Sequence, residues 1–294
     1  MKKWILATRP WSLPASVMPA LVALAYIFFH KDVFTSPDWP AGIAALIGAA
    51  IFHLAGNLIS DYFDYKKGVD SIDNIGQINL TIINGILSAK QVLMFGFTLL
   101  AIGAAIGFLL VFRCGLPVLY IGIIGTALTV SYYLLKSTAL GDLDIFITFG
   151  LLIALGTCYV TTGELHWPVL AVSSASGLLI VGILHANNTR DRKNDNRAGI
   201  TTFAMLLGLC GSKIFYTALL IGAYLIVATD IVLGLLPLTS AIVLLSLPIA
   251  VKNIRAMLRC KEMTEIAALD GQSAQLVMIF SLLVAASCFI APLI

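Results

Sequence analysis

Long apolar stretches alternate with short polar segments along almost the whole chain. A helix that crosses a membrane needs about 20 mostly apolar residues. Nine stretches meet that requirement: residues 13–29, 40–59, 92–112, 116–135, 145–162, 168–186, 214–229, 231–251 and 274–293. The seventh and eighth stretches nearly touch, so Asp230 and Gly234 are expected to form a tight hairpin. The pattern predicts an all-α polytopic membrane protein with nine transmembrane helices, in which residues 1–294 form a single membrane-embedded domain.

Composition agrees with a membrane environment. Of the 294 residues, 60% are hydrophobic and 11% are charged, whereas soluble domains are typically about 45–50% apolar and about 25% charged. These values argue against a soluble enzyme, a disordered chain and a nucleic-acid-binding domain. The five cysteines are scattered, which excludes a disulfide framework and a CxxC metal site.

The distribution of Lys and Arg predicts the orientation of the chain, because these residues collect in cytoplasmic loops. With the N-terminus inside, the inside segments hold 16 of them and the outside segments hold only Lys31 and Arg113. We therefore expect an integral membrane protein, of a prokaryotic inner membrane, whose N-terminus is cytoplasmic and whose C-terminus is outside.

Two polar clusters close the second and the sixth predicted helix at the cytoplasmic end. At 100° per residue, each cluster places one asparagine and two aspartates on one narrow helix face. These residues are Asn57, Asp61 and Asp64 in the first cluster, and Asn187, Asp191 and Asp195 in the second. The asparagine and first aspartate of the two clusters share an offset of 130 residues. That offset favours a parallel internal repeat.

The clusters indicate a cation site. At about 5 Å and an effective dielectric of about 20, each pair of carboxylates repels by roughly 3 kcal/mol, so a cation between them is stabilising. Ligands that are all oxygen favour Mg²⁺ or Ca²⁺, and basic side chains nearby would hold phosphate oxygens. These are Lys66, Lys67, Arg190, Arg192 and Lys193. The residues predict a Mg²⁺-bound diphosphate at the mouth of an apolar cavity. A solvated loop is the simpler alternative, and the matched spacing disfavours it.

Several motifs occur in a characteristic order. They are Arg9-Pro-Trp-Ser-Leu-Pro14, Asp61-Tyr-Phe-Asp-Tyr-Lys-Lys-Gly-Val-Asp70, Asn84-Gly-Ile-Leu-Ser88, Gly141-Asp142 with Phe149-Gly150, and Asn187-Asn-Thr-Arg-Asp191 through Asp195 to Gly199. The chain resembles the UbiA superfamily of intramembrane aromatic prenyltransferases, which have nine helices around a central cavity and two Asp-rich motifs. Within it, the sequence is most similar to the 1,4-dihydroxy-2-naphthoate prenyltransferase branch of menaquinone synthesis.

The resemblance implies a role for each polar residue. Catalytic Mg²⁺ ions would be bound by Asp61, Asp64, Asp191 and Asp195. Metal or diphosphate would be bound by Asn57 and Asn187, and the polyprenyl diphosphate would be faced by Lys66, Lys67 and Arg190. The prenyl cation would then alkylate an aromatic quinone precursor, for which 1,4-dihydroxy-2-naphthoate is the expected acceptor.

The sequence departs from the family pattern at three places. Ser60 stands where Asn is usual, residues 78–80 lack a usual basic residue, and Ile200 replaces a usual Lys. Another superfamily enzyme with a different aromatic acceptor, a haem or a lipid alcohol stays open. So does a catalytically weakened relative that binds prenyl lipid. A transporter is disfavoured because its acidic residues should lie near the bilayer midplane.

Four other features have simpler interpretations. His53 is expected to pack between helices rather than to line an acceptor pocket, and Tyr132 and Tyr133 to form an interfacial belt. Asp142 and Asp144 are expected to cap the fifth helix, and the alternative for Asp142, which matches the family motif, is that it reaches the pocket. Residues 252–270 are expected to form an amphipathic helix on the surface.

Overall fold

The computed structural model describes residues 2–34, 36–67, 81–197 and 199–294, and these ranges contain helices but no β-strand. The all-α prediction is confirmed. The longer helices are α2 (Pro14–Phe29), α3 (Trp39–Lys67), α4 (Ala89–Cys114), α5 (Leu116–Ser137), α7 (Ile153–Thr162), α8 (Pro168–Arg197), α9 (Phe203–Val232), α10 (Leu247–Arg259) and α11 (Leu269–Ile290). The shorter elements are α1 (Lys2–Ala7), η1 (Pro10–Ser12), α6 (Gly141–Ile145), η2 (Phe146–Leu152), η3 (Leu238–Ser246), η4 (Met263–Ile266) and η5 (Ala291–Leu293).

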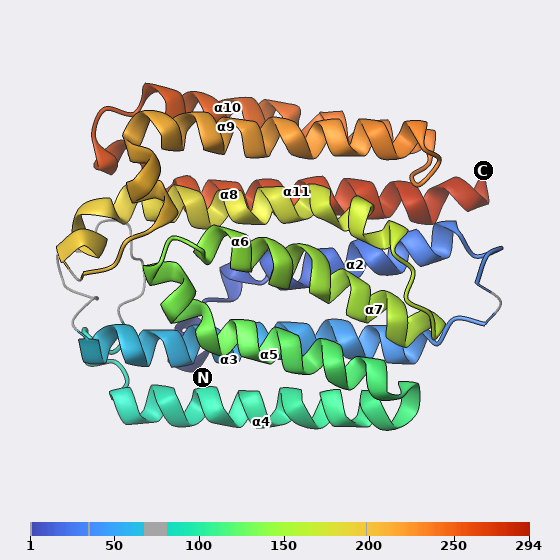
Figure 1. Cartoon of the computed structure of the whole chain (residues 1–294), viewed down its shortest axis with the longest axis horizontal. Coiled ribbons are helices and arrows are strands. Elements are labelled where there is room, and N and C mark those ends of the chain that lie inside the picture. The colour runs from blue at the N-terminus through green and yellow to red at the C-terminus, as the bar shows by residue number, and fades with distance from the viewer. Residues whose placement is uncertain (1, 35, 68–80, 198) are drawn as a thin grey trace.

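The described residues form eight helical segments that are long and apolar enough to cross a membrane. Such a chain is an integral membrane protein. A shorter apolar stretch, Leu116–Tyr132 of α5, runs lengthwise with them (Figure 1). The predicted count of nine crossings depends on this stretch and stays a prediction.

The predicted hairpin between the seventh and eighth spans is confirmed. The amides of Leu235 and Leu236 donate to the carbonyl of Asp230 at 2.8 and 3.1 Å, and Gly234 adopts a left-handed φ of 72°. The predicted bounds of the two spans were wrong. The seventh begins at Phe203 and the eighth runs over Leu238–Arg259. Apolar residues alone do not show where a helix turns or that a helix continues through a polar last turn. Residues 252–259 thus complete α10 instead of forming a separate surface helix.

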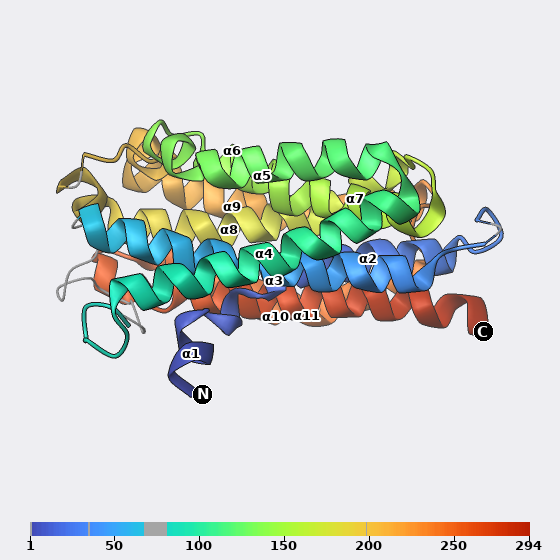
Figure 2. The same cartoon turned by 90° about the horizontal axis from the view of Figure 1, so that it is seen from below.

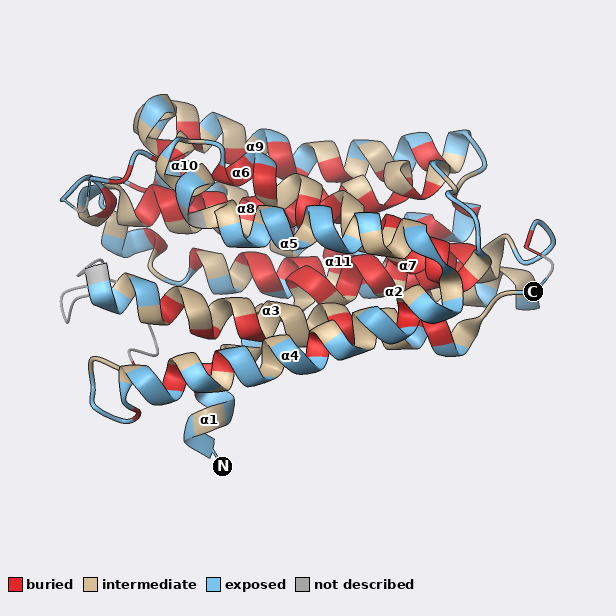
Figure 3. Ribbon diagram, turned by 60° about the horizontal axis from the view of Figure 1, so that its bottom comes forward, coloured by how far each residue is buried: buried red, intermediate tan, exposed pale blue. Residues whose placement is uncertain are grey.

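The bundle has a buried centre and apolar outer helices. Most residues of α2 and α8 are buried, whereas α4 and α5 are largely exposed (Figure 3). The exposed side chains of these outer helices are themselves apolar, as at Phe112 and Val130. Such a surface suits lipid and not water.

A close backbone crossing fixes α8 against η2. A Cβ atom added to Gly177 would lie 2.8 Å from the Cα atom of Gly150, and the reverse distance is 2.9 Å. Only glycine at both positions permits this approach. η2 is a π-helical segment, an element that often marks functional sites.

Both long helices that carry the polar clusters finish at one end of the bundle. In Figure 1, α3 and α8 end on the left, while the C-terminus lies at the opposite end. The short α1 at the N-terminus projects from the bundle, and the chain enters the bundle through η1 (Figure 2). The architecture therefore brings the two acidic clusters to the same end of the molecule.

Candidate functional site

The N-terminal segment covers the polar face of α3. The Asn57 side-chain amide donates to the Thr8 carbonyl at 3.0 Å and to the Ser12 hydroxyl at 2.9 Å. One turn further along, Asp61 forms an ion pair with Arg9. The predicted asparagine–aspartate face therefore exists, and a cation already lies on its carboxylate.

Arg9 reaches Asp61 from a strained backbone conformation. It has a left-handed φ of 53° and ψ of 57°, although it is not glycine and it precedes Pro10. Such conformations cost on the order of 1–3 kcal/mol and cluster at functional sites. Arg9 was absent from the predicted site residues, although it begins one of the motifs.

The rest of the first cluster lies around the last turns of α3. The Ser60 hydroxyl donates to Asp64 at 3.3 Å, so the serine that departs from the family pattern orients a predicted metal ligand. Lys66 is exposed. The Lys67 side chain and residues 78–80 lie outside the part of the structure that is described.

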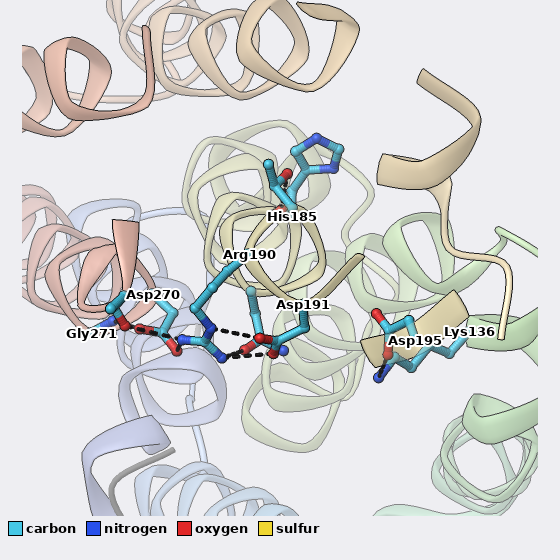
Figure 4. Close-up of polar contacts among 10 residues, drawn as sticks. Lys136, His185, Arg190, Asp191, Asp195, Asp270 and Gly271 are labelled. Atoms are coloured by element: carbon cyan, nitrogen blue, oxygen red, sulfur yellow. Dashed lines mark hydrogen bonds and ion pairs between the residues drawn. The ribbon is translucent and has the colours of Figure 1, made fainter. Parts of the chain in front are cut away.

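The second cluster is organised around Arg190. Its guanidinium donates to both oxygens of Asp191 at 2.8 Å each, and it contacts the Asn187 side-chain oxygen (Figure 4). The same group donates to the Ala267 carbonyl at 3.1 Å and to Asp270 at 2.8 Å, both next to the start of α11. No local pattern indicated Asp270, because it lies 80 residues from Arg190 in the chain.

Lys136, at the end of α5, links the two clusters. Its ammonium lies 3.6 Å from Asp195, apart from the Arg190 group (Figure 4). It follows the apolar stretch Leu116–Tyr132. Burial by itself lowers the pKa of this ammonium. The surrounding acidic groups outweigh burial and raise the pKa of Lys136 above its ordinary value. These groups are Tyr132, Asp195, Asp64 and Asp191. In the sequence analysis, Lys136 was only one of the positive charges predicted to lie on the cytoplasmic side. In the structure, it interacts electrostatically with aspartates at the ends of both α3 and α8.

Asp142 does not cap a helix, which corrects the prediction. It accepts from the His185 ring Nδ1 at 2.6 Å, and the Asn188 side-chain amide donates to it at 3.4 Å. His185 is fully buried. These contacts attach α6 to α8 within one turn of Asn187, so Asp142 helps to set the position of the second cluster. Asp144 likewise makes no cap, and it accepts from Thr148 at 3.3 Å.

His53 packs as expected. Its ring lies edge-on to Phe149, and its Nε2 is 3.0 Å from the Ser12 hydroxyl. Ile200 is 3% exposed, and its amide donates to the Asp195 carbonyl at 2.9 Å. The residue in place of the usual Lys thus packs inside the turn that follows α8.

The donor set fits a hard divalent cation. Both oxygens of Asp191 and the side-chain oxygen of Asn187 already converge on one cationic group, and oxygen ligands of this kind suit Mg²⁺. The four predicted carboxylates do not form one cluster. Within the described ranges, no group of three or more His, Cys, Asp or Glu residues is arranged to hold a metal. Arg9, Lys136 and Arg190 instead balance the carboxylates separately, because like charges repel unless a cation lies between them.

Comparison with known sequences agrees with the motifs. A model of the UbiA prenyltransferase family matches residues 16–277. The chain is 35% identical over 256 residues to UbiA prenyltransferase domain-containing protein 1 of Danio rerio, which covers 84% of this chain and 73% of that protein.

Solved structures agree with the fold. A UbiA homologue from Aeropyrum pernix K1 superposes with a TM-score of 0.69 at 15% identity, over 95% of this chain and 98% of that one. A UbiA homologue from Archaeoglobus fulgidus, bound to DMAPP and Mg²⁺, gives 0.59 at 15% identity, over 97% and 99% of the two chains.

Proposed function

Because this chain belongs to the UbiA prenyltransferase family, we propose that it transfers an isoprenyl group from a polyprenyl diphosphate to an aromatic acceptor, with Mg²⁺ as cofactor. One observation carries the proposal: three oxygens of Asn187 and Asp191 converge on a cation, at the same end of the bundle as the paired Asp61 (Figure 1). The Archaeoglobus fulgidus homologue, solved with DMAPP and Mg²⁺, supports the same ligands.

The residues divide into two roles. Metal would be held by Asp61, Asp64, Asp191 and Asp195, with Asn57 and Asn187 beside them. When bound, Mg²⁺ neutralises the diphosphate and makes it a better leaving group. The basic residues contact the phosphate oxygens and stabilise the charge that develops on them as the prenyl carbon departs. These are Lys66, Lys67 and Arg190, to which Arg9 and Lys136 are added because each already pairs with a predicted metal ligand.

We propose 1,4-dihydroxy-2-naphthoate as the acceptor, which would place the reaction in menaquinone synthesis. The acidic end of the bundle would face the cytoplasm, since 16 of the 18 Lys and Arg residues belong to the predicted inside segments. A prokaryotic cytoplasmic membrane remains a prediction. Two alternatives remain to be distinguished by the product. An enzyme of the same family with a different acceptor would form a different prenylated product, and a weakened relative would form little or none.

The test incubates the purified full chain in detergent with Mg²⁺, prenyl diphosphates of several lengths and a panel of aromatic acceptors. Mass spectrometry is expected to detect prenylated 1,4-dihydroxy-2-naphthoate. Asp61→Ala, Asp191→Ala or EDTA should abolish the product, because each removes the metal or one of its ligands. Asp38→Asn is the matched control, since Asp38 pairs with Arg113 away from both clusters. Full activity in EDTA would exclude the Mg²⁺-dependent mechanism. A different prenylated product would show that the acceptor is not 1,4-dihydroxy-2-naphthoate.

A further inference from the structure

All five N–H donors of Arg190 are engaged, and they divide into two groups. Nε and one terminal nitrogen contact Asp191 and Asn187, while the other terminal nitrogen contacts Asp270 and the Ala267 carbonyl. A guanidinium has five donors in a rigid planar fork. One edge of this fork therefore faces the predicted metal ligands, and its other end is attached to α11.

The attachment to α11 is buried at its Arg190 end and partly exposed at Asp270. The side chain of Arg190 is 2% exposed and that of Asp270 is 30% exposed. The contact joins residues 80 positions apart, and α11 itself packs against α8. Two acceptors on one nitrogen keep that end of the guanidinium in place even if the other contacts are lost.

We propose that Asp270 is a positioning residue that keeps Arg190 at the site when metal arrives. The inference rests on the proposed function. In the structure, the Arg190 guanidinium pairs with Asp191. If the oxygens of Asp191 and Asn187 held a divalent cation, the three guanidinium donors that now contact them would be released. Asp270 and the Ala267 carbonyl retain the other two, so the released edge stays beside the metal and can donate to the diphosphate that the metal binds.

Removing the Asp270 charge has a predictable direction. Asp270 competes with Asp191 for the same guanidinium. With Asp270→Asn, Arg190 pairs more strongly with Asp191 and the metal must displace a tighter partner. One charge-assisted hydrogen bond corresponds to about a tenfold change in affinity. The dissociation constant of the metal should therefore rise about tenfold.

The test measures binding of Mn²⁺, which takes oxygen ligands as Mg²⁺ does, by the loss of its free electron paramagnetic resonance signal. It uses the full chain in detergent without substrate. Asp270→Asn should weaken binding about tenfold, and Asp270→Glu should restore most of it. Glu265→Gln is the matched control, because the Glu265 carboxylate caps the neighbouring η4 by accepting from the backbone amides of Lys261 and Glu262. Thermal unfolding of the metal-free variants checks that each is folded.

A second variant tests whether Asp270 acts through Arg190. In an Arg190→Lys background, Asp270→Asn should have no further effect, because lysine lacks the fork that joins both carboxylates. Arg190→Lys alone should tighten Mn²⁺ binding, because lysine lacks the fork that pairs with both oxygens of Asp191. This variant tests the proposal even if Asp270→Asn does not fold. Unchanged affinity in Asp270→Asn would overturn the proposal, as would an equal loss in both backgrounds. Failure of the wild-type chain to bind Mn²⁺ would instead count against the proposed function.

Discussion

Replacing Gly177 by alanine should separate the helix that carries the second cluster from η2. The added Cβ would lie 2.8 Å from the Gly150 Cα atom, whereas ordinary contact begins at 3.4 Å, so the two backbones must part by about 0.6 Å. The Gly150 Cα atom belongs to the backbone, so it cannot rotate away as a side chain could. Overpacking of this kind costs about 1–3 kcal/mol, and the better helix propensity of alanine returns at most about 1 kcal/mol. We expect a net loss of about 1–2 kcal/mol.

The movement should also reduce activity, because Asn187 and Asp191 lie on the same helix. A 1 Å misplacement can cost about 100-fold in rate, so about tenfold is expected here. The assays are thermal unfolding in detergent and the steady-state rate of prenyl transfer. Gly107→Ala in α4 is the matched control, since nothing lies within 4 Å of its added Cβ. Equal melting temperatures for Gly177→Ala and Gly107→Ala would refute the reasoning.

Three further predictions concern charge and orientation. Ile200→Lys should lower the melting temperature relative to Ile200→Met, because the site is 3% exposed and an unpaired buried ammonium costs several kcal/mol. Lys136→Gln should raise the KM for prenyl diphosphate about tenfold, since it removes a cation between the two acidic helix ends, and an unchanged KM would remove Lys136 from the site. Cysteines at Lys66 and Asn196 should be labelled from one side of the membrane and a cysteine at Val33 from the other. Labelling of Lys66 and Asn196 from opposite sides would exclude a shared site.

The helical architecture could be read from the sequence because the membrane imposes it. A span needs about 20 apolar residues whatever its neighbours are, so most of the spans appear as continuous apolar runs. Helical periodicity also placed Asn57 with Asp61, and Asn187 with Asp191, on one face each. Periodicity could not predict which residues of other segments contact each of these faces, because a periodic pattern describes one helix at a time.

The contacts that organise the site all join distant parts of the chain. Arg9 meets Asp61 across 52 residues, and Arg190 meets Asp270 across 80. Asp142 was misassigned as a helix cap for the same reason: its partner, His185, lies 43 residues away. Caps are local and therefore visible in a sequence, whereas a buried carboxylate that accepts from another helix gives no local signal.

The pairing of carboxylates with basic side chains accounts for how a deeply acidic site stays folded without its ligands. Asp61, Asp191 and Asp195 each have a basic partner, and these partners come from three separate parts of the chain. Removing a cation from a buried pair leaves an uncompensated charge, which costs about 3–5 kcal/mol, so metal binding is more favourable when diphosphate binds as well. The carboxylates would hold the metal and the released basic side chains would pair with the diphosphate, so each charge would exchange one partner for another. On this reasoning metal and diphosphate bind cooperatively. Mn²⁺ affinity measured with and without inorganic diphosphate should therefore differ by tenfold or more. Equal affinities would mean that the basic residues do not leave the carboxylates when the ligands bind.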